Sequence, residues 1–491
     1  MRRLTGFGVL LLAWTAGAGC GGETPSGAGA GEEVTATGSA LCGSGTLDAN
    51  SKFFVPEPDS GAVQQIKSLL KSRHLGEAAR LTAMSLTPQA VWFTDGTPQD
   101  VKKAVRKTMA AAALQHRVPV LVAYDIPFRD CAQYSAGGAL DTAAYQAWID
   151  GFAAGIGGDQ AVVILEPDSL GIIPYHTDLD GSSDWCQPTV TDSMGNTVPA
   201  PGADTATRFA QLNYAVDRLA SKAPGALVYL DGTHSGWLNV GEAASRLSKA
   251  GVARAQGFFL DISNYQLSPN LAQYGTWLSS CLAYATVVAP GDFNSCPNQY
   301  WNGGPLPSKI AQLNGEWNGV ALDSSRAWSD ATDTIALNTS GINLRYANML
   351  GSNVPAAHFI VDTSRNGNGP LATAPYAAAP YNQPASVIGA LNGGAWCNPP
   401  GAGLGLRPTA NTGVALLDAY LWVKIPGQSD GSCDIAGGAR GWDYTQYDPW
   451  GLTGDAQNHF DPLWGIVDPG AGTWFPQQAL QLAQLANPPL L

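Results

Sequence analysis

The sequence has little charge, and positive charge is the scarcer kind. Charged residues occupy 13% of its 491 positions, where roughly 25% is usual. Lys and Arg number 26 against 39 Asp and Glu, which gives a formal net charge of −13. Phosphate backbones are bound by basic surfaces, so nucleic acid is excluded as a partner. The hydrophobic content of 45% excludes disorder for most of the chain.

Long hydrophobic runs are also missing, except for a short one at the start. Arg2 and Arg3 precede an apolar run over residues 4–14, which is too short to span a membrane and is typical of an export signal. Two cleavage positions fit the small residues that follow. The cut falls either after Ala18, or directly before Cys20 with a lipid attached to that cysteine.

Composition then divides the chain into three parts. We predict a signal peptide over residues 1–19, a flexible tether rich in Gly, Ala, Ser and Thr over 20–46, and one folded domain over 47–491. The protein is accordingly expected to be secreted, or lipid-anchored at the cell surface through Cys20.

Metal-binding motifs are absent from the sequence. None of the 8 cysteines forms a CxxC pair, and no HExxH occurs, so we expect neither a metal nor another cofactor. In an exported protein the cysteines are candidates for disulfides. Their spacing alone does not decide which of them pair.

What the sequence does contain is a recurring alternation of strand-like and helix-like segments. Short apolar runs are separated by amphipathic stretches, the pattern of a parallel sheet wound into a barrel. The expected helices are 100–117, 142–156, 205–223 and 242–250. The expected strands are 91–93, 120–124, 161–165, 226–230, 257–262, 358–361 and 421–425.

Two intervals interrupt this alternation. Residues 265–356 are too many for one crossover and contain Cys281 and Cys296, so we predict a loop-rich insertion that a disulfide could staple. A second insertion is expected over 434–470, which is rich in Gly, Asp and Trp.

Polar side chains follow every predicted strand. Because the carboxyl ends of parallel strands meet at one face of a barrel, these residues are expected to share a site. They are Asp95, Asp125, Asp130, Glu166, Asp168, Asp231, Asn264, Asp362, Gln428 and Asp430.

Two of these carboxylates suit acid catalysis. Asp168 follows a buried strand and Pro167, and apolar neighbours favour the protonated form that a general acid needs. Asp130 follows the preceding strand and could share the same cleft. The alternative is structural: Asp130 pairs with Arg129, and Asp168 caps a helix.

Several longer motifs together resemble glycoside hydrolase family 6, a family of β-1,4-glucan hydrolases. The two most specific are YDIPFRDC at 124–131 and ILEPDSL at 164–170, in that order along the chain. Further matches are YLDGTHSGW at 229–237, DTSRNG at 362–367 and RPTANTG at 407–413. The resemblance implies a distorted seven-stranded (β/α) barrel, TIM-like, with long loop insertions, and makes 47–491 the catalytic domain.

The resemblance also implies catalytic roles. Asp168 becomes the general acid, and Asp130 the second carboxylate that keeps its proton in place. Asp430 matches the candidate base, although a water chain passing the loop serine Ser135 is a competing route for proton removal. Tyr124 would lie beneath the distorted sugar ring.

Substrate-binding positions carry over as well. The implied sugar-stacking residues are Trp92, Trp237 and Trp396, and the implied polar contacts are Asp231, His234, Asn264, Lys424 and Gln428. At the position of Gln428 many family members have Glu. At Val240, members that enclose the substrate in a tunnel have a Trp, so a different distal subsite is expected.

Disulfides Cys131–Cys186 and Cys397–Cys433 follow from the same resemblance. Cys281–Cys296 is added because those two cysteines are close in sequence. Cys42 is left free, or paired with Cys20 if that residue carries no lipid.

The sequence therefore predicts a monomeric, exported enzyme that hydrolyses β-1,4-glucosidic bonds in cellulose or related β-glucans with inversion. Short connections from Asp130 to Thr142 and from Asp430 to Cys433 favour endo-action, because exo-acting relatives cover the cleft with long loops there. One alternative is an exo-acting cellobiohydrolase. The other, from a different class, is a catalytically silent glucan-binding surface lipoprotein, and Gln428 is the only feature that favours it.

Overall fold

A computed structural model describes residues 47–300, 320–433 and 440–491 of the chain. The predicted signal peptide and tether, with Cys20 and Cys42, lie outside the described residues. Within the described part, no helix is both long enough and apolar enough to cross a membrane.

Seven parallel strands form the central sheet, in the order β1-β2-β3-β6-β7-β8-β9. A separate antiparallel hairpin, β4 (Thr189–Thr191) with β5 (Thr197–Pro199), lies in the connection after β3. The strands of the main sheet are β1 (Val91–Phe93), β2 (Val120–Ala123), β3 (Ala161–Leu165), β6 (Ala226–Asp231), β7 (Gly257–Leu260), β8 (His358–Asp362) and β9 (Leu417–Leu421).

This sheet confirms the predicted seven-stranded α/β barrel and shows where it is distorted. Every neighbouring pair is parallel, but the sheet order ends at β1 and β9 without pairing them. In the described chain a backbone bond from Ala90 N to Trp422 O, 2.9 Å long, joins the segments beside these two edges. The curled sheet thus lacks strand pairing between β1 and β9, although this bond links the segments next to them.

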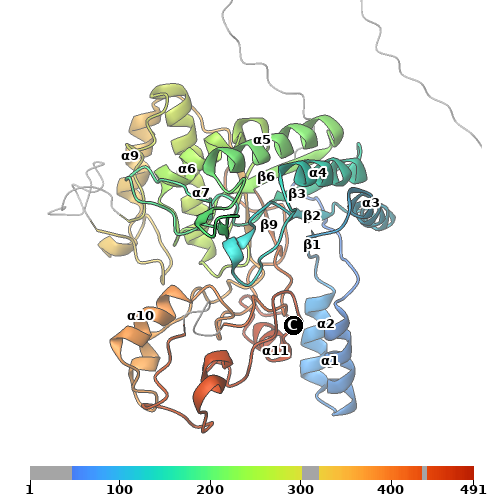
Figure 1. The fold of residues 1–491 in the computed structure, drawn as a ribbon, viewed down its shortest axis with the longest axis vertical. Helices are drawn as coiled ribbons and strands as arrows, with labels where there is room; N and C mark the ends of the chain where they lie inside the picture. Colours follow the sequence, from blue (N-terminus) through green and yellow to red (C-terminus); the bar gives the residue numbers. More distant parts are fainter. Residues whose placement is uncertain (1–46, 301–319, 434–439) are drawn as a thin grey trace, which may run out of the picture. The chain divides into compact units, whose positions relative to one another are not determined.

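Four helices match the predicted ones and cover the outer face of the sheet. They are α3 (Pro98–Leu114), α4 (Thr142–Ile156), α5 (Thr205–Lys222) and α6 (Val240–Lys249). Figure 1 shows α3, α4 and α5 side by side along one flank of the sheet. Asp and Thr side chains cap the first three of them: Thr97, Asp141 and Asp204 accept bonds from the first-turn N–H groups.

The prediction of a loop-rich insertion over 265–356 is wrong in part, because two helices lie within that interval. α7 (Ser268–Ala283) and α9 (Ser340–Leu350) continue the helical layer. α7 carries no charged residue and buries polar ones: Asn270, fully buried, donates to the carbonyls of Ser324 and Arg326 at 3.3 and 3.0 Å. The amphipathic pattern of α7 is therefore weak, and the sequence did not indicate a helix here.

The seventh strand lies earlier than predicted, at Leu417–Leu421 and not at 421–425. The sequence did not indicate this strand because it contains a charged residue, Asp418. In the structure the Asp418 carboxylate is bound by Tyr229 and His358, each at 2.6 Å. The apolar run that follows turns away from the ladder, since Val423 N and Lys424 N donate to Asp362.

Four further helices lie outside the predicted set. α1 (Ser60–Lys71), α2 (Leu75–Ser85) and α11 (Pro476–Gln484) pack together, as Figure 1 shows for α2 and α11. α10 (Ala385–Gly393) packs with Trp442 of the second insertion. Of the predicted insertion 434–470, residues 440–470 contain one 3-10 turn, Gly454–His459, and no strand or α-helix, which agrees with a loop-rich segment.

The hydrophobic core is divided by the sheet. Val120, Val122, Val162 and Ile164 belong to the cluster inside the barrel, whereas the residues between them in sequence pack outward against the helices. This alternation follows from the period of two in a strand. The structure also contains the three expected disulfides, Cys131–Cys186, Cys281–Cys296 and Cys397–Cys433.

Candidate active site

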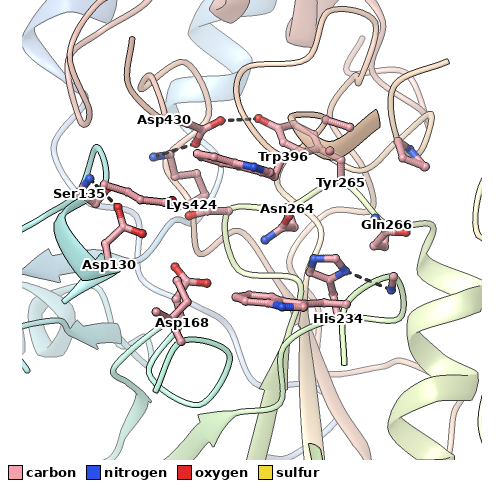
Figure 2. A pocket seen from close by; sticks show the side chains of 18 of the residues that line it. Asp130, Ser135, Asp168, His234, Asn264, Tyr265, Gln266, Trp396, Lys424 and Asp430 are labelled. Atoms are coloured by element: carbon pink, nitrogen blue, oxygen red, sulfur yellow. Dashed lines mark hydrogen bonds and ion pairs between the residues drawn. The ribbon is translucent and has the colours of Figure 1, made fainter. Parts of the chain in front are cut away.

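A cavity of about 400 Å³ opens at the carboxyl ends of the strands (Figure 2). Most of the predicted site residues meet there, although they come from connections far apart in sequence. The predicted residues that line it are Trp92, Tyr124, Asp130, Ser135, Asp168, His234, Trp237, Asn264, Trp396, Lys424 and Asp430.

The two predicted acid-catalysis residues follow β3 and β2 in strained backbone conformations. Asp168 has φ of 63° and Asp130 has φ of 55°, values that non-glycine residues seldom adopt. Glu166, between β3 and Asp168, shares this feature with φ of 53°. Such strain persists only where the surrounding structure enforces it, and it is typical of functional sites.

The surroundings of Asp168 favour the protonated form of its carboxyl group. Burial raises the pKa of its carboxyl well above the usual value, and the negative charges of Asp231 and Asp130 raise it further. A raised pKa favours the proton-carrying carboxyl that a general acid must present.

Asp130 is held next to it by the loop that follows. Its carboxylate accepts a bond from Ser135 N at 2.8 Å. Burial raises its pKa to about 6, against the opposing effects of the Ser135 bond and the Arg129 charge. Arg129 itself donates to the carbonyls of Thr94, Tyr124 and Ser135, so its hydrogen bonds do not bear out the structural alternative for Asp130.

The loop that carries Ser135 is fixed by close packing. Gly138 has φ of 93°, and a Cβ there would lie 2.0 Å from the carbonyl oxygen of Ile126. Arg129 closes the other side of the loop and lies over the ring of Tyr124, 4.4 Å from its centroid. Tyr124 is almost fully buried and lines the cavity together with Asp130, Ser135 and Asp168.

Asp430, the candidate base, is surrounded by cationic and hydrogen-bonding partners. Arg365 and Lys424 pair with it at 2.9 and 3.3 Å, and Tyr265 donates to it at 2.8 Å (Figure 2). Burial alone would raise the pKa of this carboxyl, but the charges of Arg365 and Lys424 outweigh burial and lower it. Asp430 is therefore ionised throughout the neutral range.

Aromatic rings and neutral polar groups complete the walls. The indole N–H of Trp92 donates to Val423 O at 2.8 Å, which leaves its ring to face the cavity. Trp237 lies 5.7 Å from His234, ring centre to ring centre. Burial lowers the pKa of His234 to about 3, so its imidazole is neutral, and Nδ1 accepts a bond from Gly236 N.

Two predicted substrate-binding residues lie elsewhere. Asp231 lies beneath the cavity, where its carboxylate accepts bonds from the N–H groups of Leu170 and Gly171 and so supports the loop after Asp168. Gln428 lines an adjoining cavity of about 590 Å³, and its amide donates to Asp59 at 3.0 Å.

The structure adds residues that the sequence did not single out. Arg365 is completely buried and was predicted only as part of a motif, while Tyr265, Gln266 and Trp185 line the cavity. A buried arginine needs a carboxylate partner. The position of Arg365 directly after a predicted strand was therefore the feature of the sequence that could have indicated its role. Nothing in the local sequence indicated that Trp185 would reach the cavity.

A cluster of possible metal ligands, His176, Asp178 and Glu242, is already neutralised. Arg246 pairs with Asp178 at 2.5 Å and with Glu242 at 2.6 Å. Its guanidinium therefore supplies the positive charge between these two carboxylates.

Comparisons with known proteins identify the family of the chain. The family model described as glycosyl hydrolases family 6 matches residues 48–486. Endoglucanase 1 of Streptomyces sp. (strain KSM-9) is 31% identical over 349 residues, or 71% of this chain. Endoglucanase A of Thermobispora bispora is 28% identical over 407 residues, or 82% of this chain. The chain spans 65% and 62% of the length of these two relatives.

A solved structure gives the same result. The endoglucanase Cel6 from Mycobacterium tuberculosis, in complex with methyl-cellobiosyl-4-deoxy-4-thio-β-D-cellobioside, is 27% identical, with a TM-score of 0.54. The match covers 90% of this chain and 99% of that one. The parallel barrel, with buried carboxyl groups in an aromatic cavity at the carboxyl ends of its strands, has the architecture of a glycoside hydrolase. The chain belongs to glycosyl hydrolases family 6.

Proposed function

We propose that this protein hydrolyses β-1,4-glucosidic bonds in cellulose or related β-glucans, with inversion at the anomeric carbon. The observation that carries the proposal is the pair of Asp168 and Asp130 in one cavity walled by Trp92, Trp237 and Trp396, where burial raises the pKa of Asp168. Membership of family 6 and the similarity to endoglucanases support it.

In the proposed reaction, Asp168 protonates the leaving glycosidic oxygen. Asp130 keeps that proton on Asp168 beforehand, because its negative charge disfavours ionisation of a neighbouring carboxyl. A water attacks the anomeric carbon from the opposite face, as inversion requires. Tyr124 lies below the ring that distorts towards the transition state.

Proton removal from the attacking water has two candidate routes. Asp430 carries the negative charge that a base needs, but its ion pairs with Arg365 and Lys424 weaken its basicity. The loop at Ser135 lies in the same cavity and offers a path for a water chain. We assign the base function to Asp430, acting directly or by orienting that water.

Endo-action is the mode that the short connections favour. Between Asp130 and Thr142 the chain makes only the 3-10 turn Asp130–Ala132 before α4 begins. Neither this connection nor the three-residue step from Asp430 to Cys433 is long enough to form a roof. The silent glucan-binding alternative is less well supported, because both carboxylates of the acid step are present in the cavity.

Product analysis tests the proposal directly. On a soluble cellulose derivative, endo-action predicts a fast fall in viscosity for few new reducing ends, whereas exo-action releases cellobiose with little change in viscosity. Proton NMR early in the hydrolysis of cellohexaose should show the α-anomer first. An initial β-anomer would overturn the inverting mechanism, and no product at all would overturn the enzymatic function.

Export belongs to the same proposal. We propose that the mature protein is a monomer, secreted or anchored through a lipid on Cys20. Mass spectrometry of the mature N-terminus distinguishes a cut after Ala18 from a lipidated Cys20, and an uncut N-terminus would contradict both.

A further inference from the structure

Trp185 is a solvent-exposed tryptophan at the edge of the active-site cavity. Its side chain is 53% exposed, yet it lines the same cavity as Asp168 and Trp237. An exposed indole provides a flat apolar face on which the C–H face of a pyranose can stack. Its exposure in the free protein leaves that face available to a ligand.

The backbone around Trp185 is fixed on both sides. The next residue, Cys186, forms the disulfide with Cys131, which adjoins Asp130 in sequence. The preceding residue, Asp184, donates its N–H to His176 O at 2.8 Å and accepts a bond from Trp185 N at 3.1 Å. The indole is therefore carried on a pre-organised segment, which lowers the entropy lost when a ligand binds.

Trp237 packs against Gly171, which Arg246 links to the segment that carries Trp185. A Cβ on Gly171 would lie 2.3 Å from the indole of Trp237, so that ring packs directly against the Gly171 backbone. Arg246 connects the two positions, because its Nη1 donates to Gly171 O at 3.3 Å and lies 3.4 Å from the Asp184 carboxylate. Both tryptophans thus lie at the same end of the cavity.

The first residue of α6 contributes no ring to this end of the cavity. Val240, where a tunnel-forming relative would have a tryptophan, is completely buried and cannot contact a ligand. We propose that Trp185 is an additional sugar-stacking residue, which binds a glucosyl unit of the β-glucan chain beyond the one on Trp237. This inference rests on the proposed function, since it assigns the substrate of that function to a further residue.

Stacking on Trp185 makes binding depend on the length of the oligosaccharide. An oligosaccharide too short to reach from the reacting bond to Trp185 gains nothing from the ring, whereas a longer one does. Trp185→Ala should lower kcat/KM for cellohexaose by about 10-fold, mainly through KM, and should leave cellotriose within about twofold. Trp185→Phe should recover most of the loss, because it restores an aromatic face.

The experiment compares cellotriose to cellohexaose with the wild type, Trp185→Ala and Trp185→Phe. Met194→Ala serves as the matched control, because Met194 is 81% exposed on the β4–β5 turn and does not line the cavity. Thermal unfolding of each variant shows whether the loop has remained folded. A loss of the same size at every chain length, or no loss at cellohexaose in an active enzyme, would overturn the role of Trp185.

Calorimetric binding separates this inference from the proposed function. In an Asp168→Asn background, which blocks turnover, Trp185→Ala should weaken cellohexaose binding by about 10-fold and leave cellotriose binding unchanged. Wild-type protein that hydrolyses nothing would refute the proposed function, yet the binding series would still support Trp185. Equal affinities for cellohexaose with and without the indole would refute the assignment of Trp185 alone.

Discussion

Arg365 and Asp430 form a two-point ion pair at the wall of the cavity. Nη1 and Nη2 of the arginine each lie 2.9 Å from a carboxylate oxygen of the aspartate. The arginine side chain is fully buried and the aspartate side chain is 5% exposed. Arg365 follows β8 and Asp430 follows β9, so the pair also joins the ends of the last two strands. The same contact that fixes the carboxylate in place lowers its pKa and with it its strength as a base.

Asp430→Asn should therefore affect both turnover and stability. We expect kcat to fall by at least about 10²-fold, with oligosaccharide affinity nearly unchanged, because the charge acts on the transition state. Arg365 is left without its buried counter-charge, which should lower the free energy of unfolding by about 3 to 5 kcal/mol. Steady-state kinetics, calorimetric binding and denaturant unfolding measure the three effects.

Asp418→Asn is the matched control for Asp430→Asn. Asp418 also has a partly buried basic partner, His358 at 2.6 Å, but it does not line the cavity. The control should lose stability and keep its turnover. If Asp430→Asn kept the turnover of the wild type, proton removal would have to take place without this carboxylate.

Asp168→Asn should abolish leaving-group protonation and leave the fold intact. The step contributes about 10²- to 10⁴-fold to the rate, so hydrolysis of cellohexaose should fall by that factor. An aryl cellobioside with an acidic phenol as leaving group needs little protonation, so its hydrolysis should fall much less. The comparison of the two substrates is the measurement.

Asp159→Asn is the control for Asp168→Asn, since its side chain is 70% exposed and pairs only loosely with Arg106 at 3.9 Å. It should leave both substrates unaffected. Equal losses on both substrates with Asp168→Asn would show that Asp168 has a role other than proton donation.

The sequence predicted the barrel and the two acids well because local signals carry them. The buried strand 161–165 and the helix 142–156 have the bounds that were expected, since their apolar patterns are unbroken. The acids lie at strand ends, where topology alone brings them together.

What the sequence could not predict depends on contacts across the fold. α7 was missed because its polar residues are satisfied by distant carbonyls, and β9 was displaced because Asp418 has buried partners. Asp231 and Gln428 were predicted to bind substrate, but their partners are Leu170 N, Gly171 N and Asp59, which no pattern near them indicates.

Glu166 should make the protein less stable as pH rises. Burial raises the pKa of this carboxyl to about 8, so the folded state binds a proton that the unfolded state releases above about pH 4.5. Stability contributed by the proton is present at low pH and is lost as pH rises towards 8, with a slope of up to about 1.4 kcal/mol per pH unit. Denaturant unfolding measured from pH 4.5 to 8 should show this decline.

Glu166→Gln should remove the contribution of about one proton to the slope of unfolding free energy against pH. The amide oxygen of the new side chain can still accept the bonds that Glu166 takes from Asp125 N and Ile126 N, so the fold should persist. Asp125, whose pKa burial raises to about 7, keeps part of the slope. Glu57→Gln, on the surface, should leave the slope as it is; an unchanged slope in Glu166→Gln would show that Glu166 is ionised in the folded state.

Gln428→Glu should act on stability and not on the catalytic pH profile. Asp59 caps α1 through one carboxylate oxygen, which accepts Gly61 N at 2.7 Å, and its other oxygen accepts the Gln428 amide at 3.0 Å. Glutamate at this position replaces that hydrogen bond with repulsion between two carboxylates, so the free energy of unfolding at pH 7 should fall by about 1 to 2 kcal/mol.

The acidic limb of kcat against pH should stay in place, because the side chain at 428 faces Asp59 and Asp430 is bound by Arg365, Lys424 and Tyr265. Combining Gln428→Glu with Asp59→Asn should recover most of the lost stability, since the amide introduced by the second change can donate to the carboxylate introduced by the first. Gln446→Glu on the exposed insertion controls for added charge and should change neither property. A shift of the acidic limb to higher pH in Gln428→Glu, with unfolding unchanged, would show that the charge couples to Asp430 across the one intervening residue and that the contact with Asp59 does not govern this segment.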